Sequence, residues 1–240
     1  MDRALLILCV LLLNAAAFGY RWKRRCYAEL RLPRFSRLGA ALVRDLERRL
    51  NRDHRSLRER ELRGMLLVVF AIVVSVLAGW LGDGLFTHNL RIVELIVLAA
   101  ALPVRATWDD VSDIRKGLQA GDVAAARQVL EGTVWRHYAA LDEYGAARAG
   151  IEMLAVHFSE KILAPAAWYM LLGLPGLFVS KAVYLLQGTL VRPGAEEGFA
   201  SATQAVHYVL HYLTARLAAL LYLAAALFLP SGKISQAAKQ

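Results

Sequence analysis

The sequence has few cysteines and lacks the short motifs by which several large enzyme classes hold their cofactors. Two cysteines occur in 240 residues, Cys9 in an apolar run and Cys26 in a basic segment, so a disulfide between them is not expected. The chain has no phosphate-binding loop of the P-loop or dinucleotide type, no Cys-x-x-Cys pair and no His-Glu-x-x-His motif. These absences argue against ATPase, dinucleotide-dependent and zinc-protease functions.

Apolar residues, by contrast, are abundant. They make up 58% of the chain, and the mean hydropathy is +0.40. Both values exceed what a soluble globular protein of this size needs to fill its core. The composition therefore predicts an integral membrane protein.

Positive charge is concentrated in one segment. Residues 21–63 contain fifteen Lys or Arg and six Asp or Glu, and this surplus of nine equals the net charge of the whole chain, +9. Lys and Arg beside an apolar segment favour the cytoplasmic side of a membrane. We expect Arg21 to Arg63 to face the anionic inner leaflet of a bacterial inner membrane, and a nucleic-acid partner is disfavoured.

The apolar runs predict an all-α fold, a polytopic transmembrane helical bundle with a cytoplasmic helical insert and a broken or re-entrant helix. An amphipathic helix is expected over about 38–63, and membrane spans are expected near 65–80, 92–104 and 205–229. Asp122 is expected to begin a helix after Gly121 as its N-cap. The expected organisation is a transmembrane anchor at 1–20 with its N-terminus outside, a basic cytoplasmic amphipathic segment at 21–63, a transmembrane helix pair at 64–104, a cytoplasmic helical insert at 105–150, a membrane core with the candidate site at 151–230, and a tail at 231–240.

The apolar stretch 151–186 is interrupted by Pro165 and by Gly-Leu-Pro-Gly at 173–176. Broken helices at membrane depth persist where they are buried in protein or line a cavity. This stretch is therefore the best indicator of a site. The sequence leaves open whether it forms a fifth crossing or a re-entrant hairpin.

Six weak motifs occur in an order typical of one superfamily. They are GLQAGDVAAARQVL at 117–130, WRHYAALD at 135–142, IEMLAVHFSEKILAP at 151–165, GLPG at 173–176, SKAVYLL at 180–186 and TARL at 214–217. In this order the chain resembles the cobalamin-biosynthesis CobD/CbiB family, the adenosylcobinamide-phosphate synthases, and the related AmpE proteins. The resemblance implies a divergent member with a corrinoid or membrane-protein partner.

Several synthase motif positions are changed in this chain. A Glu-Asn pair and an Asp-Gly pair are replaced by Val156, His157, Glu160 and Lys161, and paired aspartates with an Asn by His207, Tyr208 and His211. The changes favour a pseudoenzyme that acts in regulation, sensing or assembly. The alternative is a synthase-like enzyme that forms an amide between a corrinoid carboxyl group and an aminopropanol-type amine, with the surviving site Glu152, Glu160, Lys181 and Arg216.

The introduced histidines suggest a ligand site. His207 and His211 are four residues apart, and His157 and Glu160 three apart, so each pair is expected on one helix face. Their convergence would suit a metal or a tetrapyrrole, and the alternative is neutral, hydrogen-bonded histidines at a helix interface. The ligand-binding candidates are His157, Glu160, Lys181, His207, His211 and Arg216. Arg216 is expected to pair with Glu160 or Glu152, or else to extend to the membrane interface.

Overall fold

The computed structural model describes residues 3–19, 33–51, 56–85, 91–133, 141–191 and 198–227. These residues form helices joined by turns, and the described part of the chain contains no strand. The all-α prediction is confirmed. Two helices, α4 (Leu57–Leu85) and α11 (Ser201–Leu227), are long and apolar enough to cross a membrane. They indicate a membrane protein without establishing a polytopic bundle.

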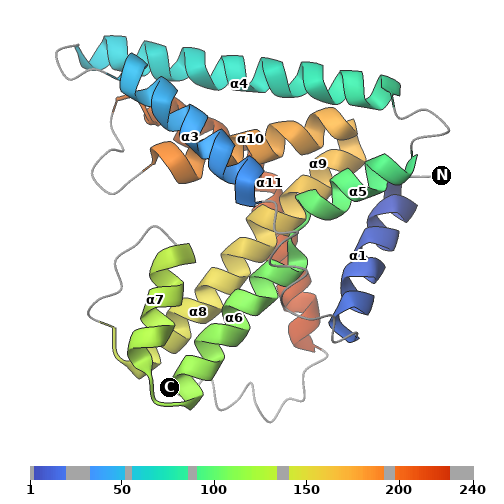
Figure 1. The fold of residues 1–240 in the computed structure, drawn as a ribbon, viewed down its shortest axis with the longest axis vertical. Coiled ribbons are helices and arrows are strands. Elements are labelled where there is room, and N and C mark those ends of the chain that lie inside the picture. The colour runs from blue at the N-terminus through green and yellow to red at the C-terminus, as the bar shows by residue number, and fades with distance from the viewer. Residues whose placement is uncertain are drawn as a thin grey trace.

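The long helix α4 forms one side of the molecule, and α3 (Pro33–Leu50) and α10 (Leu174–Leu190) pack against it (Figure 1). Their shared core contains Val43, Leu67, Val68, Leu186 and Leu190, all at most 7% exposed. The backbones approach closely at Gly79, where a Cβ atom would overlap the backbone of Pro175. This contact places α10 in the middle of the molecule.

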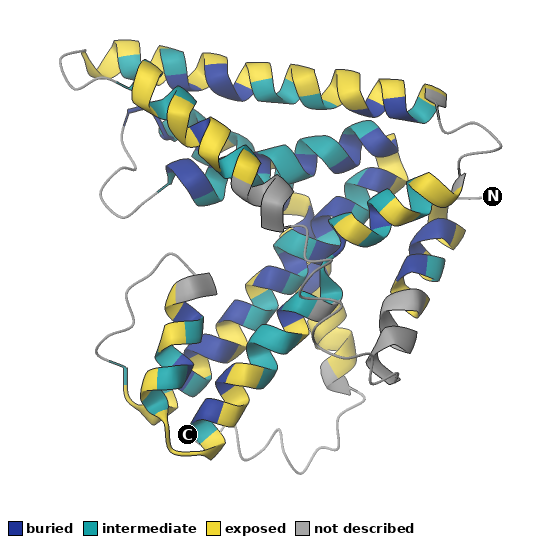
Figure 2. Cartoon of the chain, in the orientation of Figure 1, coloured by how far each residue is buried: buried dark blue, intermediate teal, exposed yellow. Residues whose placement is uncertain are grey.

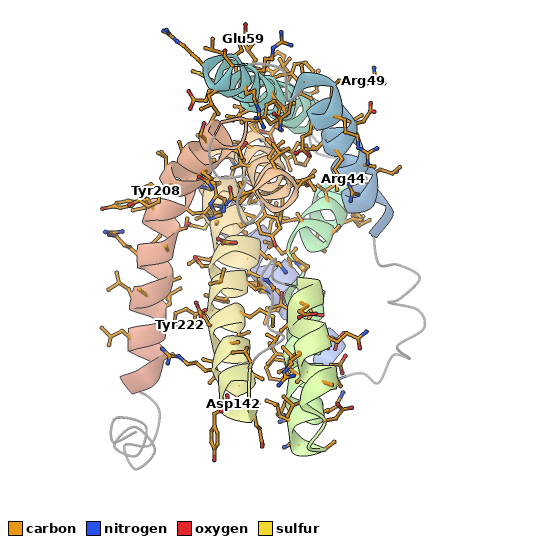
Figure 3. The ribbon with its side chains drawn as sticks, turned by 90° about the vertical axis from the view of Figure 1, so that its left-hand side faces the viewer. Arg44, Arg49, Glu59, Asp142, Tyr208 and Tyr222 are labelled. Carbon is orange, nitrogen blue, oxygen red and sulfur yellow. The ribbon has the colours of Figure 1, made fainter. Side chains whose placement is uncertain are left out.

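The outward faces of α4 and α11 are apolar and exposed (Figure 2). On α11 the inward face packs on α10 and α4, and nearer its C-terminal end the Tyr222 hydroxyl donates to the Ala155 carbonyl oxygen of α8 (Glu143–His157) at 3.1 Å. Tyr208 points away from the bundle on the other side (Figure 3). Large apolar side chains left outside a folded core mark a surface that meets lipid or a partner.

The helices α1 (Arg3–Gly19), α5 (Arg91–Ala101) and α9 (Ala164–Leu172) share a second core. Tyr169, fully buried there, donates a hydrogen bond to Glu94. At 1.5 Å per residue α5 is roughly 16 Å long, about half of a bilayer core. The helix is thus shorter than the span expected at 92–104, which stays a prediction. The apolar part of α1, Arg3–Leu12, is also shorter than the two candidate spans.

The helical insert expected at 105–150 is present as α6 (Val104–Gln119), α7 (Val123–Thr133) and the first half of α8. Gly121 has a φ of 72°, and the Asp122 carboxylate accepts a hydrogen bond from the Ala125 amide at 3.0 Å. The predicted N-cap is confirmed. The three helices have a core of their own, and its buried residues are Ile114, Ala126, Leu130, Ala146, Ala149 and Met153.

The basic segment and the first long span are divided differently from the prediction. The expected helix over 38–63 is split, because α3 ends at Leu50 and α4 begins at Leu57. At its other end α4 continues through the Gly-Asp-Gly at 82–84, beyond the end of the span expected near 65–80. Asp83 is only partly exposed and bonds the backbone of Leu174 at the start of α10, so the helix gains a polar partner there.

The broken segment is a helical hairpin. The chain continues from α8 through a π-helical turn, η1 (Phe158–Leu163), into α9 without a break at Pro165. The predicted interruption at Pro165 is therefore corrected to a change of helix type. The chain then reverses at Gly173, whose φ of 77° suits glycine, and returns as α10.

Replacing Gly79 tests the packing of α4 on α10. A Gly79→Ala substitution places a methyl group against the Pro175 backbone, which cannot give way as a side chain can. Overpacking of this kind destabilises by about 1–3 kcal/mol, so we expect a lower melting temperature for the purified protein. Gly84→Ala is the matched control on the same helix, because nothing lies within 4 Å of its Cβ position. Equal melting temperatures for the two variants would contradict this packing.

Candidate functional site

The candidate site is organised by the π-helical turn η1. Pro165 has no N–H, so it cannot donate to the carbonyl oxygen of Lys161 one turn earlier. That oxygen instead accepts a hydrogen bond from the ammonium group of Lys181 on α10, at 3.0 Å. Single π-helical turns are frequent at functional sites. Here the turn fixes the side chain of Lys181 between η1 and α10.

The same turn changes which side chains of one helix meet. His157 and Glu160 were expected to share a face, but a π-helical turn holds more residues than an α-helical turn, so a spacing of three falls short of one turn. His157, 4% exposed, instead lies with its Nδ1 atom 3.1 Å from the Lys161 ammonium. Glu160 is directed to α11. The predicted pairing of His157 with Glu160 is therefore wrong.

Glu160 meets the histidines of α11. Its Oε1 atom lies 3.5 Å from Nε2 of His207, and the two side chains are 25% and 14% exposed. The rings of His207 and His211 have centroids 4.2 Å apart, so the predicted common face of these two residues is confirmed. Lys181 is close enough to His211 to interact with it electrostatically. The cluster thus joins four elements, α8, η1, α10 and α11.

Burial changes the proton affinity of the charged groups on η1 and α10, which lie outside the two candidate spans. Burial raises the pKa of Glu160 to about 7, and the nearby positive charge of Lys161 has a smaller effect that lowers it. Burial, with help from the nearby Lys161 charge, lowers the pKa of Lys181 to about 7. The pKa of Lys161 is also lowered by burial. The cluster therefore contains a carboxyl group and an amino group whose pKa values both lie near neutral pH.

The four side chains proposed as metal ligands do not form a ligand set. His157, Glu160, His207 and His211 were expected to converge, but the described residues contain no group of three or more His, Cys, Asp or Glu side chains able to hold one ion. The physical reason is the π-helical turn, which directs His157 to Lys161 and Glu160 to His207. The donor geometry likewise gives no support to a tetrapyrrole.

Two predicted site residues lie outside the cluster. Glu152 is exposed on α8. Arg216 is exposed on α11, with its guanidinium group 3.8 Å from the ring centroid of Tyr212. The expected partners of Arg216 were Glu160 or Glu152, but its observed neighbour is an aromatic ring, and Glu160 is paired with His207. A cation over an exposed ring suits the alternative prediction, in which Arg216 extends to the interface.

The structure adds to the cluster two residues that were not among the candidates from the sequence, Lys161 and Tyr184. Lys161 bonds His157 through its side chain and Lys181 through its carbonyl oxygen. Tyr184 lies on α10 close enough to Glu160 to interact with its charge. A signal for Lys161 was present in the sequence, because a proline frees the carbonyl oxygen four residues before it.

An apolar cavity of about 480 Å³ lies beside η1. Its lining comes from α6, α8 and η1 and consists of Val104, Thr107, Trp108, Leu154, Phe158 and Ile162. Ligand pockets in proteins are roughly 300–1,000 Å³ and mostly apolar with a few polar groups. One short turn therefore supplies both part of an apolar cavity and the charged residues Glu160 and Lys161.

Comparison with known proteins agrees with the resemblance in the motifs. Residues 25–239 match the family described as CobD/Cbib protein. Proteins named "Cobalamin biosynthesis protein CobD" are similar to the chain, among them one from Sinorhizobium fredii, 34% identical over 124 residues, which are 50% of this chain and 38% of the relative. One from Rhodobacter capsulatus is 32% identical over 176 residues, 69% of this chain and 54% of the relative.

The aligned part of the chain thus spans about half of these relatives or less. No solved structure matches the chain. These matches support the resemblance to the cobalamin-biosynthesis family. They give no support to the resemblance to the AmpE proteins. The family match covers most of the chain, including α3 through α11 and the whole charged cluster. The chain belongs to the CobD/Cbib family.

Proposed function

We propose that this chain acts in cobalamin biosynthesis as an amide-forming enzyme, joining a carboxyl group of a corrinoid to an aminopropanol-type amine. Its family and the name shared by its relatives support a role in that pathway. The observation that carries the reaction type is the cluster around η1. There one carboxylate, Glu160, and two lysines, Lys161 and Lys181, meet at a half-buried place.

The charges of the cluster suit the two partners of an amide bond. An amine attacks an acyl carbon only after losing a proton, and a carboxylate with a pKa near 7 both binds an ammonium ion and accepts its proton. The carboxyl group of the corrinoid is negatively charged before it is activated, and its oxygen gains negative charge again in the transition state of amide formation. The ammonium groups of Lys161 and Lys181 are donors of the kind that stabilise such charge. The reacting corrinoid carries its carboxyl group in an activated form, such as an acyl phosphate. Phosphate leaves as the amine nitrogen bonds the acyl carbon, and the proton of the amine passes to Glu160.

The apolar cavity beside η1 suits the apolar part of a large substrate. Its lining residues Phe158 and Ile162 flank Glu160 and Lys161 in the sequence of the same turn. A substrate held there by apolar contacts would present its polar edge to the turn. Binding energy from such remote contacts helps to orient the reacting groups.

A regulatory, sensing or assembly role in the same pathway is the second candidate. It is favoured by the replaced motif positions, above all His157 and Lys161 in place of amide and glycine residues of the synthases. Both candidates place the chain in the same family. They differ in whether the cell needs this chain for the amide-forming step.

A growth experiment separates the two candidates. In a host without a second copy carrying the intact synthase motifs, deletion of this gene should make growth depend on added cobalamin. Cobinamide should restore growth, because it lies after the amide-forming step, whereas cobyric acid should not, because it lies before. Growth of the deletion strain on cobyric acid would contradict the enzymatic proposal and leave the regulatory one.

A second experiment addresses the cluster directly. Lys181→Met keeps the length of the side chain and removes its cation, so amide formation by isolated membranes should fall by about 10²-fold, the effect of removing one charge-stabilising donor. Lys181→Arg should retain more activity than Lys181→Met. Lys116→Met is the control, since Lys116 is exposed on α6 and pairs with Asp113 at 3.0 Å. Equal activity of all three variants would exclude Lys181 from the reaction.

The proposal also includes a place in the cell, namely the bacterial inner membrane with residues 21–63 and 105–150 in the cytoplasm and the N-terminus outside. Charged side chains gather where α3 and the first turns of α4 meet, including Arg44, Arg49 and Glu59 (Figure 3). The remaining basic residues of 21–32 and 52–55 lie outside the described residues. An anionic leaflet attracts such a basic segment by about 1 kcal/mol per Lys or Arg.

Reporter fusions test this orientation. Alkaline phosphatase fused after Asn51, between α3 and α4, should be inactive because the enzyme requires export to fold. The same reporter fused after Leu85, at the other end of α4, should be active. Phosphatase activity at the Asn51 fusion would overturn the orientation, and equal inactivity at both would remove α4 from the list of spans.

A further inference from the structure

Polar side chains line both sides of the contact between α10 and α11. On α10 the residues Ser180, Tyr184 and Gln187 are spaced by four and three, so they share one face. On α11 the corresponding set, spaced by four, four and three, is Thr203, His207, His211 and Thr214. We call these seven residues the α10–α11 seam. Glu160 borders it through His207 and Tyr184.

Hydrogen-bonding atoms in this seam are buried without partners. Among the described residues, seven buried side-chain nitrogen or oxygen atoms have no hydrogen-bond partner, and six of them lie in the seam. They are Ser180 Oγ, Gln187 Oε1, Thr203 Oγ1, His207 Nε2, His211 Nδ1 and His211 Nε2. His207 Nε2 is included because 3.5 Å from Glu160 is an ion-pair distance and not hydrogen-bond geometry.

Several of these groups are deeply buried. Ser180 is 1% exposed, Thr203 is fully buried and His211 is 6% exposed. A buried polar group left without a partner costs about 1–3 kcal/mol, so such groups normally have a protein or water partner. Six of them along one helix contact call for a common explanation.

Elsewhere in the molecule, Ser and Thr hydroxyls in helices donate to a backbone carbonyl oxygen of their own helix. The hydroxyl of Thr189 donates to the Leu185 carbonyl oxygen at 2.6 Å, and that of Ser75 to Ala71 at 2.7 Å. Ser180 and Thr203 stand in helices of the same kind, yet their hydroxyls make no such bond. Their oxygens are thus left available to a partner in the seam.

The seam opens to the surface where it meets η1. There the side chains of Glu160 and His207 are 25% and 14% exposed. These two side chains therefore reach the surface, while the deeper groups at Ser180, Thr203 and His211 lie within the protein. Water is the smallest molecule that both donates and accepts, and a buried water typically makes about three hydrogen bonds.

We propose that the α10–α11 seam is a binding site for a row of ordered water molecules that leads from the surface at Glu160 into the protein. The waters bond the hydroxyls of Ser180 and Thr203, the amide oxygen of Gln187 and the rings of His207 and His211. Polar residues inside membrane proteins commonly line such wet passages. These waters would also carry the proton of the amine away from Glu160, and that role rests on the proposed function. The presence of water in the seam does not depend on the proposed function.

One experiment compares two identical substitutions. If Thr203 bonds water, Thr203→Val removes a hydrogen bond and should lower the melting temperature of the purified protein. The same is expected of the control Thr189→Val, which removes the bond to Leu185. If the seam is dry, Thr203→Val removes an unpaired hydroxyl at constant volume and should leave the melting temperature unchanged or raise it. That second result would overturn the proposal.

X-ray radiolytic labelling provides a measurement on the unmodified protein. Hydroxyl radicals formed from bound water label the side chains beside it, so His211 should be labelled despite its 6% exposure. Tyr169 is the control, because it is fully buried in an apolar core and bonded to Glu94. Protection of His211 equal to that of Tyr169 would overturn the proposal. Neither measurement requires substrate or enzymatic activity. A result that contradicts water in the seam can therefore be told apart from a result that contradicts the proposed synthase function.

Discussion

The arrangement around the candidate site depends on one missing hydrogen-bond donor, the backbone nitrogen of Pro165. Without that donor the helix widens into a π-helical turn, and the carbonyl oxygen of Lys161 turns to the ammonium group of Lys181. The same turn places His157 beside Lys161 and Glu160 beside His207. A single proline thus decides which charges of α8, α10 and α11 meet. Its local cost is offset by a hydrogen bond between two helices that are far apart in the sequence.

Much of the fold could be predicted from the sequence, because the strongest signals were local. The apolar run expected at 205–229 predicted α11, which begins four residues earlier at Ser201, and Gly121 with Asp122 marked the start of α7. The failures occurred where packing overrides local preference. The Gly-Asp-Gly at 82–84 remains helical because α4 is held against α10. The apolar run after residue 91 forms an 11-residue helix with one face in the core that it shares with α1 and α9.

The candidate site was predicted less completely than the fold. His207 and His211 were assigned to one face correctly, since α-helical spacing applies to α11. The pairing of His157 with Glu160 failed because the helix type changes between them, which a pattern of 3.6 residues per turn does not detect. For Arg216 the sequence left two positions open, an inward pair with a carboxylate or extension to the interface, and its exposed place over the Tyr212 ring suits the second. Lys161 was overlooked because its main contribution is a backbone oxygen.

The two longest apolar helices do not run side by side. In Figure 1 α4 runs across the top of the molecule while α11 runs down it, and in Figure 3 α4 is seen nearly end-on while α11 still runs down. Two rods that cross cannot both stand upright in a bilayer, so at least one of them must lean when both are inserted. The candidate spans of 28 and 25 residues are about 42 and 38 Å long, with charged residues in the first turns of α4, whereas the hydrocarbon layer is about 30 Å thick. The length beyond that thickness extends past the hydrocarbon layer or is taken up by tilt of the helix.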